Sequence, residues 1–364
     1  MLIQEEGKIS AFQLFLLIVG FTLGSSTLLP PGGGIGPDNW LAPILGLGEG
    51  LLFALIYLAL ASRFPGKTLV EIDDLVWGPY LGKLFSIAFL FYLFHLGSLV
   101  ITNALDFIKF TLLPQTPPAV FILFEVGVCA LAASAGVEVL GRIVTVLVIA
   151  ATAMYFLVNI LLLPQIKWIN FQPLLATPWL KILAAGHRAA VFPFGEAVAF
   201  LMIIPFSNVP RRARSSVVAG LCFTTLLFIG AIIRNTGVLG ATADYFLYPG
   251  YSASRLINVG EIFSRLEIFM GINYITTIFI KTSILIYILM LGTAQLCKLH
   301  SYRTLTIPVW LLISLLGMNN FANVIQNLEF ANKVYPFYAL TFQVGIPLLT
   351  LVTALIRKLP REGY

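Results

Sequence analysis

The feature of this sequence that most limits its possible folds is a series of apolar stretches, each long enough to cross a lipid bilayer. A membrane-spanning helix needs about 20 mostly apolar residues. The segments that meet this requirement cover residues 10–31, 40–62, 83–112, 118–136, 141–163, 183–205, 215–238, 268–297, 304–321 and 336–357. The alternating strand pattern of an outer-membrane barrel is absent. The sequence therefore predicts an all-α membrane protein with about ten transmembrane helices.

The composition excludes several functional classes. Asp, Glu, Lys and Arg make up only 10% of the 364 residues, against roughly 25% in soluble proteins. The mean hydropathy is +0.95. Such a chain cannot cover itself with a soluble surface, so a cytosolic enzyme, a nucleic-acid binder and a disordered protein are excluded. Cys129, Cys222 and Cys297 stand singly in apolar segments, so neither a disulfide framework nor a metal site is expected.

The basic residues predict how the chain lies in the membrane, because cytoplasmic loops are enriched in Lys and Arg. With a cytoplasmic N-terminus, the outer segments hold about half as many basic residues as the inner ones. The outer group consists of Lys167, Lys181, Arg234, Arg255, Arg265 and Lys333. The strongest single indication is the cluster of Arg211, Arg212 and Arg214 between the sixth and seventh spans. We therefore expect both termini on the cytoplasmic side.

The longest connection, roughly residues 239–267, joins the seventh and eighth spans. Apolar residues recur in it at helical spacing, at Leu256, Val259, Ile262, Phe263 and Leu266. This spacing predicts a short amphipathic helix on the outer surface. The sequence leaves open whether this helix is a structural cap or a lid over an outer vestibule.

Glycine and proline interrupt the first and the sixth spans. Gly24-Ser25-Ser26 breaks the first span, and the run from Phe192 to Glu196 breaks the sixth. With five spans in each half, the second half must enter the membrane from the opposite side. We therefore expect a single domain of residues 1–364 built from an inverted repeat, about 9–163 and 183–357. Interrupted helices at matching positions of two such halves indicate a transporter-type binding site, although kinks needed only for packing would leave the same pattern.

The two breaks suit a ligand that carries both a negative and a positive charge. Unwinding a helix in the membrane frees backbone groups that protein, water or a ligand must satisfy. A half-helix N-terminus attracts a carboxylate and a C-terminus attracts an ammonium, so an α-amino acid fits both. The expected ligand-binding residues are Gly24, Ser25, Ser26, Tyr92, Phe192, Pro193, Phe194, Gly195, Glu196, Thr276 and Thr277.

Several stretches of the sequence are similar to one known family. They are Ile9 to Leu14 at the start of the first span, Gly24 to Ser26 at its break, Gly36 to Leu41 before the second span, Phe192 to Glu196 in the sixth, and Arg265 to Glu267 before the eighth. In these residues the chain resembles the spore-germination permease family, the B-type subunit of germinant receptors, within the amino acid/polyamine/organocation superfamily. The similarity covers essentially the whole chain, and the Phe-Pro-Phe-Gly-Glu run is its most specific part.

The resemblance implies a leucine-transporter-like fold of five plus five helices in the inner membrane of bacterial endospores. It further implies a subunit that binds a nutrient germinant, commonly an amino acid, and acts with an A-type membrane subunit and a C-type lipoprotein subunit to trigger germination. The family often has Ala-Gly-Gln-Asp before the tryptophan, whereas this chain has Gly-Gly-Ile-Gly-Pro-Asp-Asn before Trp40. The outer end of the first span is therefore expected to differ in shape.

Two charged residues inside the spans are candidates for a coupling or charge-compensating role, because charges in the membrane are costly. Lys281 lies in the eighth span, which lines the central cavity in the resembled fold, where it could replace the sodium ion of sodium-coupled relatives. Alternatively, it forms a structural ion pair with Glu49, Glu125 or Glu196. Glu196 could face a ligand ammonium or cap backbone NH groups of the sixth span.

Three functions remain open from the sequence. The chain could be a ligand-sensing subunit, an autonomous amino acid permease that is possibly proton-coupled, or a scaffold subunit with a vestigial pocket. No nucleophile and base pair or metal cluster is visible among His95, His187, His300 and their surroundings, so an enzyme is not expected. No cofactor and no nucleic-acid partner are expected, and the lipid bilayer is the surrounding medium.

Overall fold

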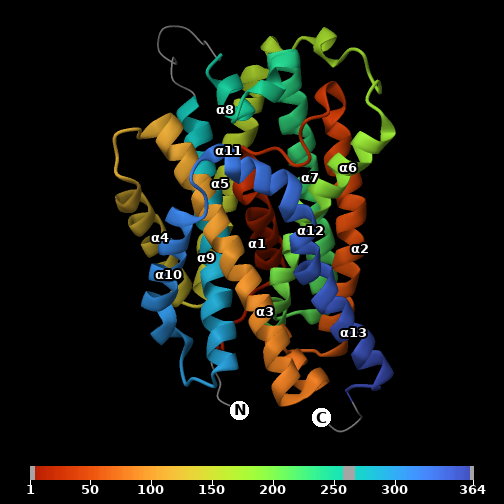
Figure 1. The fold of residues 1–364 in the computed structure, drawn as a ribbon, viewed down its shortest axis with the longest axis vertical. Coiled ribbons are helices and arrows are strands. Elements are labelled where there is room, and N and C mark those ends of the chain that lie inside the picture. Colours follow the sequence, from red (N-terminus) through yellow and green to blue (C-terminus); the bar gives the residue numbers. More distant parts are fainter. Residues whose placement is uncertain (1–4, 257–266, 361–364) are drawn as a thin grey trace.

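The computed structural model describes residues 5–256 and 267–360, and helices make up nearly all of this part of the chain. They form one elongated bundle, with both ends of the described chain at its lower end in Figure 1. The described residues contain no strand, and the one isolated bridge among them pairs Ile9 with Ser207. The predicted all-α class is confirmed.

The helices of the first half overlap the predicted spans, although the third begins at Leu69 and not near residue 83. In chain order they are α1 (Ala11–Leu23), α2 (Leu41–Arg63), α3 (Leu69–Phe107), α4 (Pro118–Ser134) and α5 (Val137–Leu162). Short 3₁₀ or π segments extend or connect them, namely η1 (Gly24–Thr27), η2 (Gly36–Trp40), η3 (Ile108–Leu112), η4 (Leu163–Gln165) and η5 (Trp168–Phe171).

The second half is more fragmented. Its helices are α6 (Trp179–Ala189), α7 (Pro210–Leu239), α8 (Pro249–Ser254), α9 (Glu267–Leu296), α10 (Thr306–Asn319), α11 (Val324–Glu329), α12 (Tyr335–Leu340) and α13 (Ile346–Ile356). Between them lie η6 (Ala190–Phe194), η7 (Gly195–Met202), η8 (Ile204–Phe206), η9 (Gly240–Tyr245), η10 (Tyr302–Leu305), η11 (Phe330–Val334) and η12 (Thr341–Gly345).

Local sequence signals fix where two of the central helices begin. The Ser10 side chain accepts from the Gln13 backbone NH at 3.1 Å, and the Gln13 side chain accepts from the Ser10 NH at 2.8 Å. This reciprocal capping box satisfies two NH groups at the start of α1. Thr68 and Glu71 form the same motif at the start of α3. Near its start α3 bends at Gly78, whose φ of +82° suits glycine.

Burial distinguishes the central helices from the lipid-facing ones. In the most apolar part of α9, 83% of the residues are buried, compared with 22% in the stretch that contains α5. Figure 1 shows α3 and α9 running side by side through the bundle, where they pack against each other. The hydrophobic core therefore lies around α3, α9 and α1, and it is these helices that surround the candidate site.

Six of the described helical stretches are long and apolar enough to cross a membrane, and α1 with η1 and α4 are shorter apolar helices. The chain is thus an integral membrane protein, as predicted. The count of ten spans and the inverted repeat stay predictions. The last apolar stretch begins at Val324 rather than at residue 336. Its first turns carry polar residues such as Asn327, which bonds to α3 instead of facing lipid, so hydropathy alone missed them.

Arg234, counted above with the outer loops, is only 2% exposed and lies within α7, so it is not a loop residue. The described part of the long connection contains η9 and α8. Of the predicted amphipathic helix, Leu256 is described, while Val259, Ile262, Phe263 and Leu266 lie outside the described residues.

Candidate ligand-binding site

The first span is broken at Gly24. The α-helix ends at Leu23, and Gly24 adopts φ +25° and ψ −126° before the 3₁₀ turn η1. A Cβ at this position would lie 2.4 Å from Cδ of Lys281. The break therefore requires glycine both for its backbone angles and for the close approach of α9. The carbonyl freed at Gly24 accepts a hydrogen bond from the Thr277 hydroxyl at 3.0 Å.

The sixth span is broken between Ala189 and Gly195. Phe192 has extended angles of φ −127° and ψ 112°, and a 3₁₀ segment follows from Gly195. The freed carbonyls have side-chain donors: Gln343 donates to Val191 at 3.0 Å, and Tyr57 donates to Gly195 at 3.1 Å. Both predicted breaks are present, and each exposes peptide groups that other helices engage.

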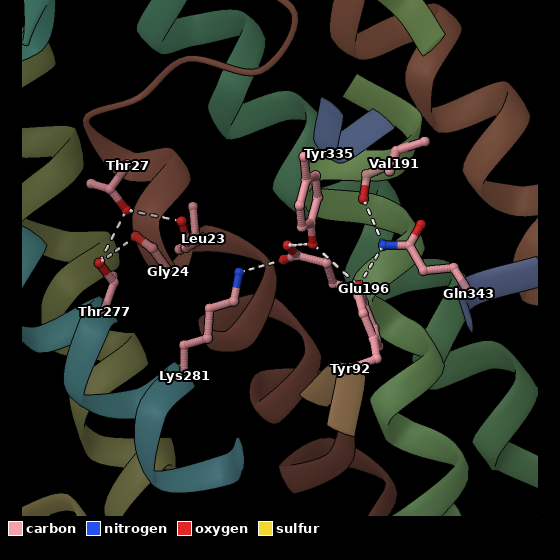
Figure 2. A network of polar contacts seen from close by, with 10 residues as sticks. All are labelled: Leu23, Gly24, Thr27, Tyr92, Val191, Glu196, Thr277, Lys281, Tyr335 and Gln343. Atoms are coloured by element: carbon pink, nitrogen blue, oxygen red, sulfur yellow. Dashed lines mark hydrogen bonds and ion pairs between the residues drawn. The ribbon is translucent and has the colours of Figure 1, made fainter. Parts of the chain in front are cut away.

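A buried polar network surrounds Glu196 at the break of the sixth span (Figure 2), and its member Lys281 packs against Gly24 at the break of the first. Lys281 of α9 forms an ion pair with Glu196 of η7, and both side chains are fully buried. The second carboxylate oxygen of Glu196 accepts from the Tyr335 hydroxyl at 2.6 Å. Tyr335 contacts the Tyr92 hydroxyl at 3.1 Å, and Gln343 donates to Tyr92 at 2.8 Å. Five residues from five helical elements thus form one hydrogen-bonded chain.

The network shows which of the three candidate acids pairs with Lys281. Lys281 pairs with Glu196, while Glu49 bonds to His187 at 2.8 Å. One carboxylate oxygen of Glu125 is buried without a hydrogen-bond partner among the described residues. Glu196 does not act as a helix cap, since η7 has no side-chain cap. Aromatic rings flank the ammonium of Lys281, with Phe21 at 5.2 Å and Phe192 at 5.4 Å from Nζ to the ring centre.

A cavity of about 520 Å³ extends from this network toward the upper end of the bundle. Its buried end is formed by Ser25, Glu196 and Tyr335, and its exposed end by Gly34 and Asp244. The volume is in the range of about 300–1,000 Å³ typical of small-molecule sites. Apolar side chains of α3, namely Leu96, Leu99 and Val100, line one wall. The cavity is therefore large enough for a small organic molecule.

The structure brings three predicted site residues to the cavity wall: Ser25, Phe192 and Glu196. Most of the others are buried beside it and hold the breaks in place, namely Gly24, Ser26, Tyr92, Pro193, Phe194, Gly195 and Thr277. Thr276 is half-buried and does not line the cavity. Lys281 does not line the cavity, but its ion-pair partner Glu196 does.

The hydroxyl of Ser25 makes no hydrogen bond to any described residue, although it is fully buried and lines the cavity. Thr22 and Ser26, on the same helix, also have buried hydroxyls without a partner in the described chain. A buried polar atom without a partner costs free energy, which a bound ligand or water recovers. The break in the first span is thus the part of the site with unused hydrogen-bonding capacity.

Several site residues escaped the sequence analysis. Tyr335 and Gln343 belong to the network, while Arg188, Asn103 and Asn327 line the cavity. A signal existed for Gln343, because an amide inside an apolar span is costly unless it is used. Arg188 lies near the start of the sixth predicted span, and Asn327 lies in the polar stretch before the last predicted span.

The chemistry of the site is that of binding. In the described part of the chain, no three His, Cys, Asp or Glu residues lie close enough to hold a metal ion. The polar groups that line the cavity are hydroxyls, amides, two carboxylates and a guanidinium, surrounded by apolar walls. Such a combination fixes the orientation of a small polar molecule and excludes water from it.

Solved structures with a similar fold are transporters. The nucleobase-cation-symport-1 family transporter Mhp1, in a closed conformation with bromovinylhydantoin bound, aligns with a TM-score of 0.68 at 11% identity, over 98% of this chain and 93% of that one. MhsT in complex with L-phenylalanine aligns with a TM-score of 0.59 at 14% identity, over 98% and 99%. The leucine-transporter-like fold implied by the resemblance is thereby confirmed.

Proteins related in sequence match this chain over nearly its whole length. Spore germination protein KB of Bacillus subtilis (strain 168) is 29% identical over 98% of this chain and 97% of its own length. Spore germination protein YndE of the same organism is 23% identical over 96% and 97%. The profile of the spore permease family, described as spore germination protein, matches residues 8–323. The chain is a membrane-embedded helical bundle with two broken spans around a cavity, and the family profile matches most of its length. The chain therefore belongs to the spore germination protein family of permeases.

Proposed function

We propose that this protein is the nutrient-sensing membrane subunit of a spore germinant receptor. In this proposal a small molecule, an amino acid, binds in the cavity beside the two broken spans and triggers germination. Membership of the spore germination protein family supports the receptor role. The transporter fold, represented by MhsT in complex with L-phenylalanine, supports a small-molecule ligand at the centre of the bundle.

One observation carries this proposal: Ser25, whose buried hydroxyl has no partner in the described chain, lines a 520 Å³ cavity whose buried end holds Glu196. Ser25 lies at the break of the first span and Glu196 at the break of the sixth. A molecule that bonds to both joins the two breaks. Its binding free energy then depends on how the breaks are placed relative to each other.

A ligand that contacts both breaks shifts the population toward the conformation in which both contacts form. In the proposed receptor, an A-type membrane subunit and a C-type lipoprotein subunit receive this change. The subunit lies in the spore inner membrane with both termini on the cytoplasmic side, which is the side of the spore core. The extent of the shift is limited by the difference in affinity of the ligand for the two conformations.

The test is ligand binding to the purified chain in lipid nanodiscs, measured by calorimetry against amino acids and sugars. Gly24→Ala places a methyl group 2.4 Å from Lys281 and should abolish binding. Gly48→Ala is the matched control, because a Cβ there meets no atom within 4 Å, and it should bind like the parent. Equal affinities for both variants would remove the cavity from the mechanism.

An autonomous permease is the second candidate, and the buried Lys281 and Glu196 pair favours it because such a pair can exchange a proton. Liposomes that contain only this chain separate the two functions. Accumulation of a radiolabelled amino acid, increased by an inward proton gradient, would establish the permease. Binding without accumulation would support the sensor.

A further inference from the structure

Arg188 stands on the wall of the cavity, one turn before the break of the sixth span. It belongs to α6, is half-buried, and lines the cavity together with Phe192 and Glu196. A guanidinium in this position is surrounded by protein on one side and faces the ligand space on the other. Its charge is therefore only weakly screened, and any anion that enters the cavity interacts with it strongly.

The hydrogen bonds of Arg188 leave its charge uncompensated. Nε and Nη2 donate to the carbonyl of Gly32 at 3.2 and 2.7 Å, and Nη2 donates to Gly33 at 2.9 Å. Both acceptors are neutral, and Nη1 makes no hydrogen bond within the described chain. Lys281 differs, because Glu196 already neutralises it. Among the cavity-lining residues described, Arg188 is thus the cation available to an anionic ligand.

A guanidinium fixed in this way selects a carboxylate. The carbonyls of Gly32 and Gly33 occupy Nε and Nη2 and hold the guanidinium in one orientation, so the free N–H groups of Nη1 can donate charge-assisted hydrogen bonds to a carboxylate oxygen. Little side-chain entropy is then lost when a ligand binds. Arg188 also has the opposite effect on ligands with an ammonium group alone, which it repels.

The two carboxylates that line the cavity limit which other charged groups the ligand can carry. Glu196 closes the buried end, and Asp244 lies at the exposed end, where it accepts from the Gly36 NH at 3.2 Å. A dianion such as a phosphate monoester would approach both carboxylates, whereas a molecule with one carboxylate and one ammonium has no net charge to repel. The lining charges therefore favour a zwitterion over a dianion.

We propose that Arg188 is the carboxylate-recognising residue of the cavity and that the cavity selects small amino-carboxylates. This inference rests on the proposed function, to which it adds the chemical group that is recognised and the residue that recognises it. The rival explanation is structural: Arg188 only ties α6 to the glycine-rich segment between the first two spans. The two explanations differ in which ligands an Arg188 variant loses.

The experiment compares each amino acid that binds with its carboxamide. Purified chain in nanodiscs is titrated with the standard L-amino acids, and every binder is then tested as its α-carboxamide, which lacks the anion. A charge-assisted pair predicts that the parent prefers the carboxylate by roughly tenfold or more. In Arg188→Gln this preference should fall to about one, and in Arg188→Lys it should be reduced but retained.

Each alternative outcome is distinct. A structural role would weaken the amino acid and its carboxamide equally, so an unchanged ratio in Arg188→Gln overturns the inference while the proposed function stands. If no standard amino acid binds the parent but a sugar does, the amino-carboxylate class is overturned as well. Arg142→Gln, which removes an exposed arginine paired with Glu138, is the control and should keep the parental ratio.

Discussion

The two broken spans of this protein satisfy their freed polar groups in different ways. At the sixth span, Gln343 and Tyr57 bond to the exposed carbonyls, and Glu196 has a partner at each carboxylate oxygen. At the first span, Thr277 bonds to the carbonyl of Gly24, while the hydroxyls of Thr22, Ser25 and Ser26 have no partner within the described chain.

This difference separates two roles within one site. At the sixth span the carbonyls of Val191 and Gly195 and both carboxylate oxygens of Glu196 are bonded by the protein, so movement there costs hydrogen bonds in a medium without water. A break with unpartnered hydroxyls gains free energy when a ligand supplies the missing bonds. We therefore interpret the sixth span as the fixed wall of the site and the first span as its receptive wall. Substitutions on the two sides should then have different consequences.

The largest effect should follow from removing one charge of the buried pair. Lys281→Met leaves the Glu196 carboxylate buried without its cation, which costs about 3–5 kcal/mol in unfolding free energy. Reversible unfolding of the detergent-solubilised chain measures this cost. The double variant Lys281→Met with Glu196→Gln should recover a large part of it, because no net charge then remains buried.

Lys333→Met is the control for this substitution. Lys333 pairs with Glu329, but both side chains are mostly exposed, so the variant should lose at most about 0.5 kcal/mol. If Lys281→Met were as stable as Lys333→Met, the sixth span would not be braced by the ion pair, and the contrast between the two breaks would be lost.

A smaller effect is expected from removing the tyrosine hydroxyl that also bonds to the Glu196 carboxylate. Tyr335→Phe removes the 2.6 Å hydrogen bond to the carboxylate and should cost about 1.5–3 kcal/mol, the usual contribution of a bond to a charged group. Tyr338→Phe is a matched control on the same helix, α12, since its hydroxyl contacts the His95 ring at 3.1 Å. A neutral bond of this kind contributes about 0.5–1.5 kcal/mol. The same unfolding assay ranks the two, and the reverse order would contradict the central role of Glu196.

The smallest change in stability should occur at the first span. Ser25→Ala removes a hydroxyl that has no partner in the described chain, so the unfolding free energy should change by no more than about 0.5 kcal/mol. Ligand affinity should nevertheless fall, by up to roughly tenfold for one lost hydrogen bond.

Ser26→Ala tests whether this fall is specific to the cavity. Ser26 is also buried and unpartnered among the described residues, but it does not line the cavity. Calorimetric titration should therefore give the parental affinity for Ser26→Ala. Equal losses at both positions would mean that the whole turn, and not a ligand contact at Ser25, determines binding.

The sequence was sufficient for the features that depend on local composition. Apolar length indicated a helical membrane protein, and glycine and proline located both breaks, because backbone angles such as those of Gly24 depend on one residue and its neighbours. The charges at 196 and 281 were recognisable as costly in the membrane.

The remaining features depend on distances between helices, which no local pattern contains. Lys281 had three acids within spans as possible partners, and only packing brings Glu196 to it. Gln343 and Arg188 were recognisable only as costly polar residues in spans, and Tyr335 not at all, because their roles arise where α12, η12 and α6 come together near Glu196. The start of the last apolar stretch at Val324 was missed because it carries polar side chains. The amide of Asn327, for example, faces α3 and the cavity instead of lipid.

The ammonium at the centre of the molecule is covalently attached to α9. A free metal cation at the same place would dissociate whenever its concentration in the medium fell, whereas a tethered one stays at full occupancy. The positive charge that balances Glu196 is therefore present at any salt concentration of the medium. For the same reason, the pairing of these two buried charges does not depend on an ion gradient across the membrane.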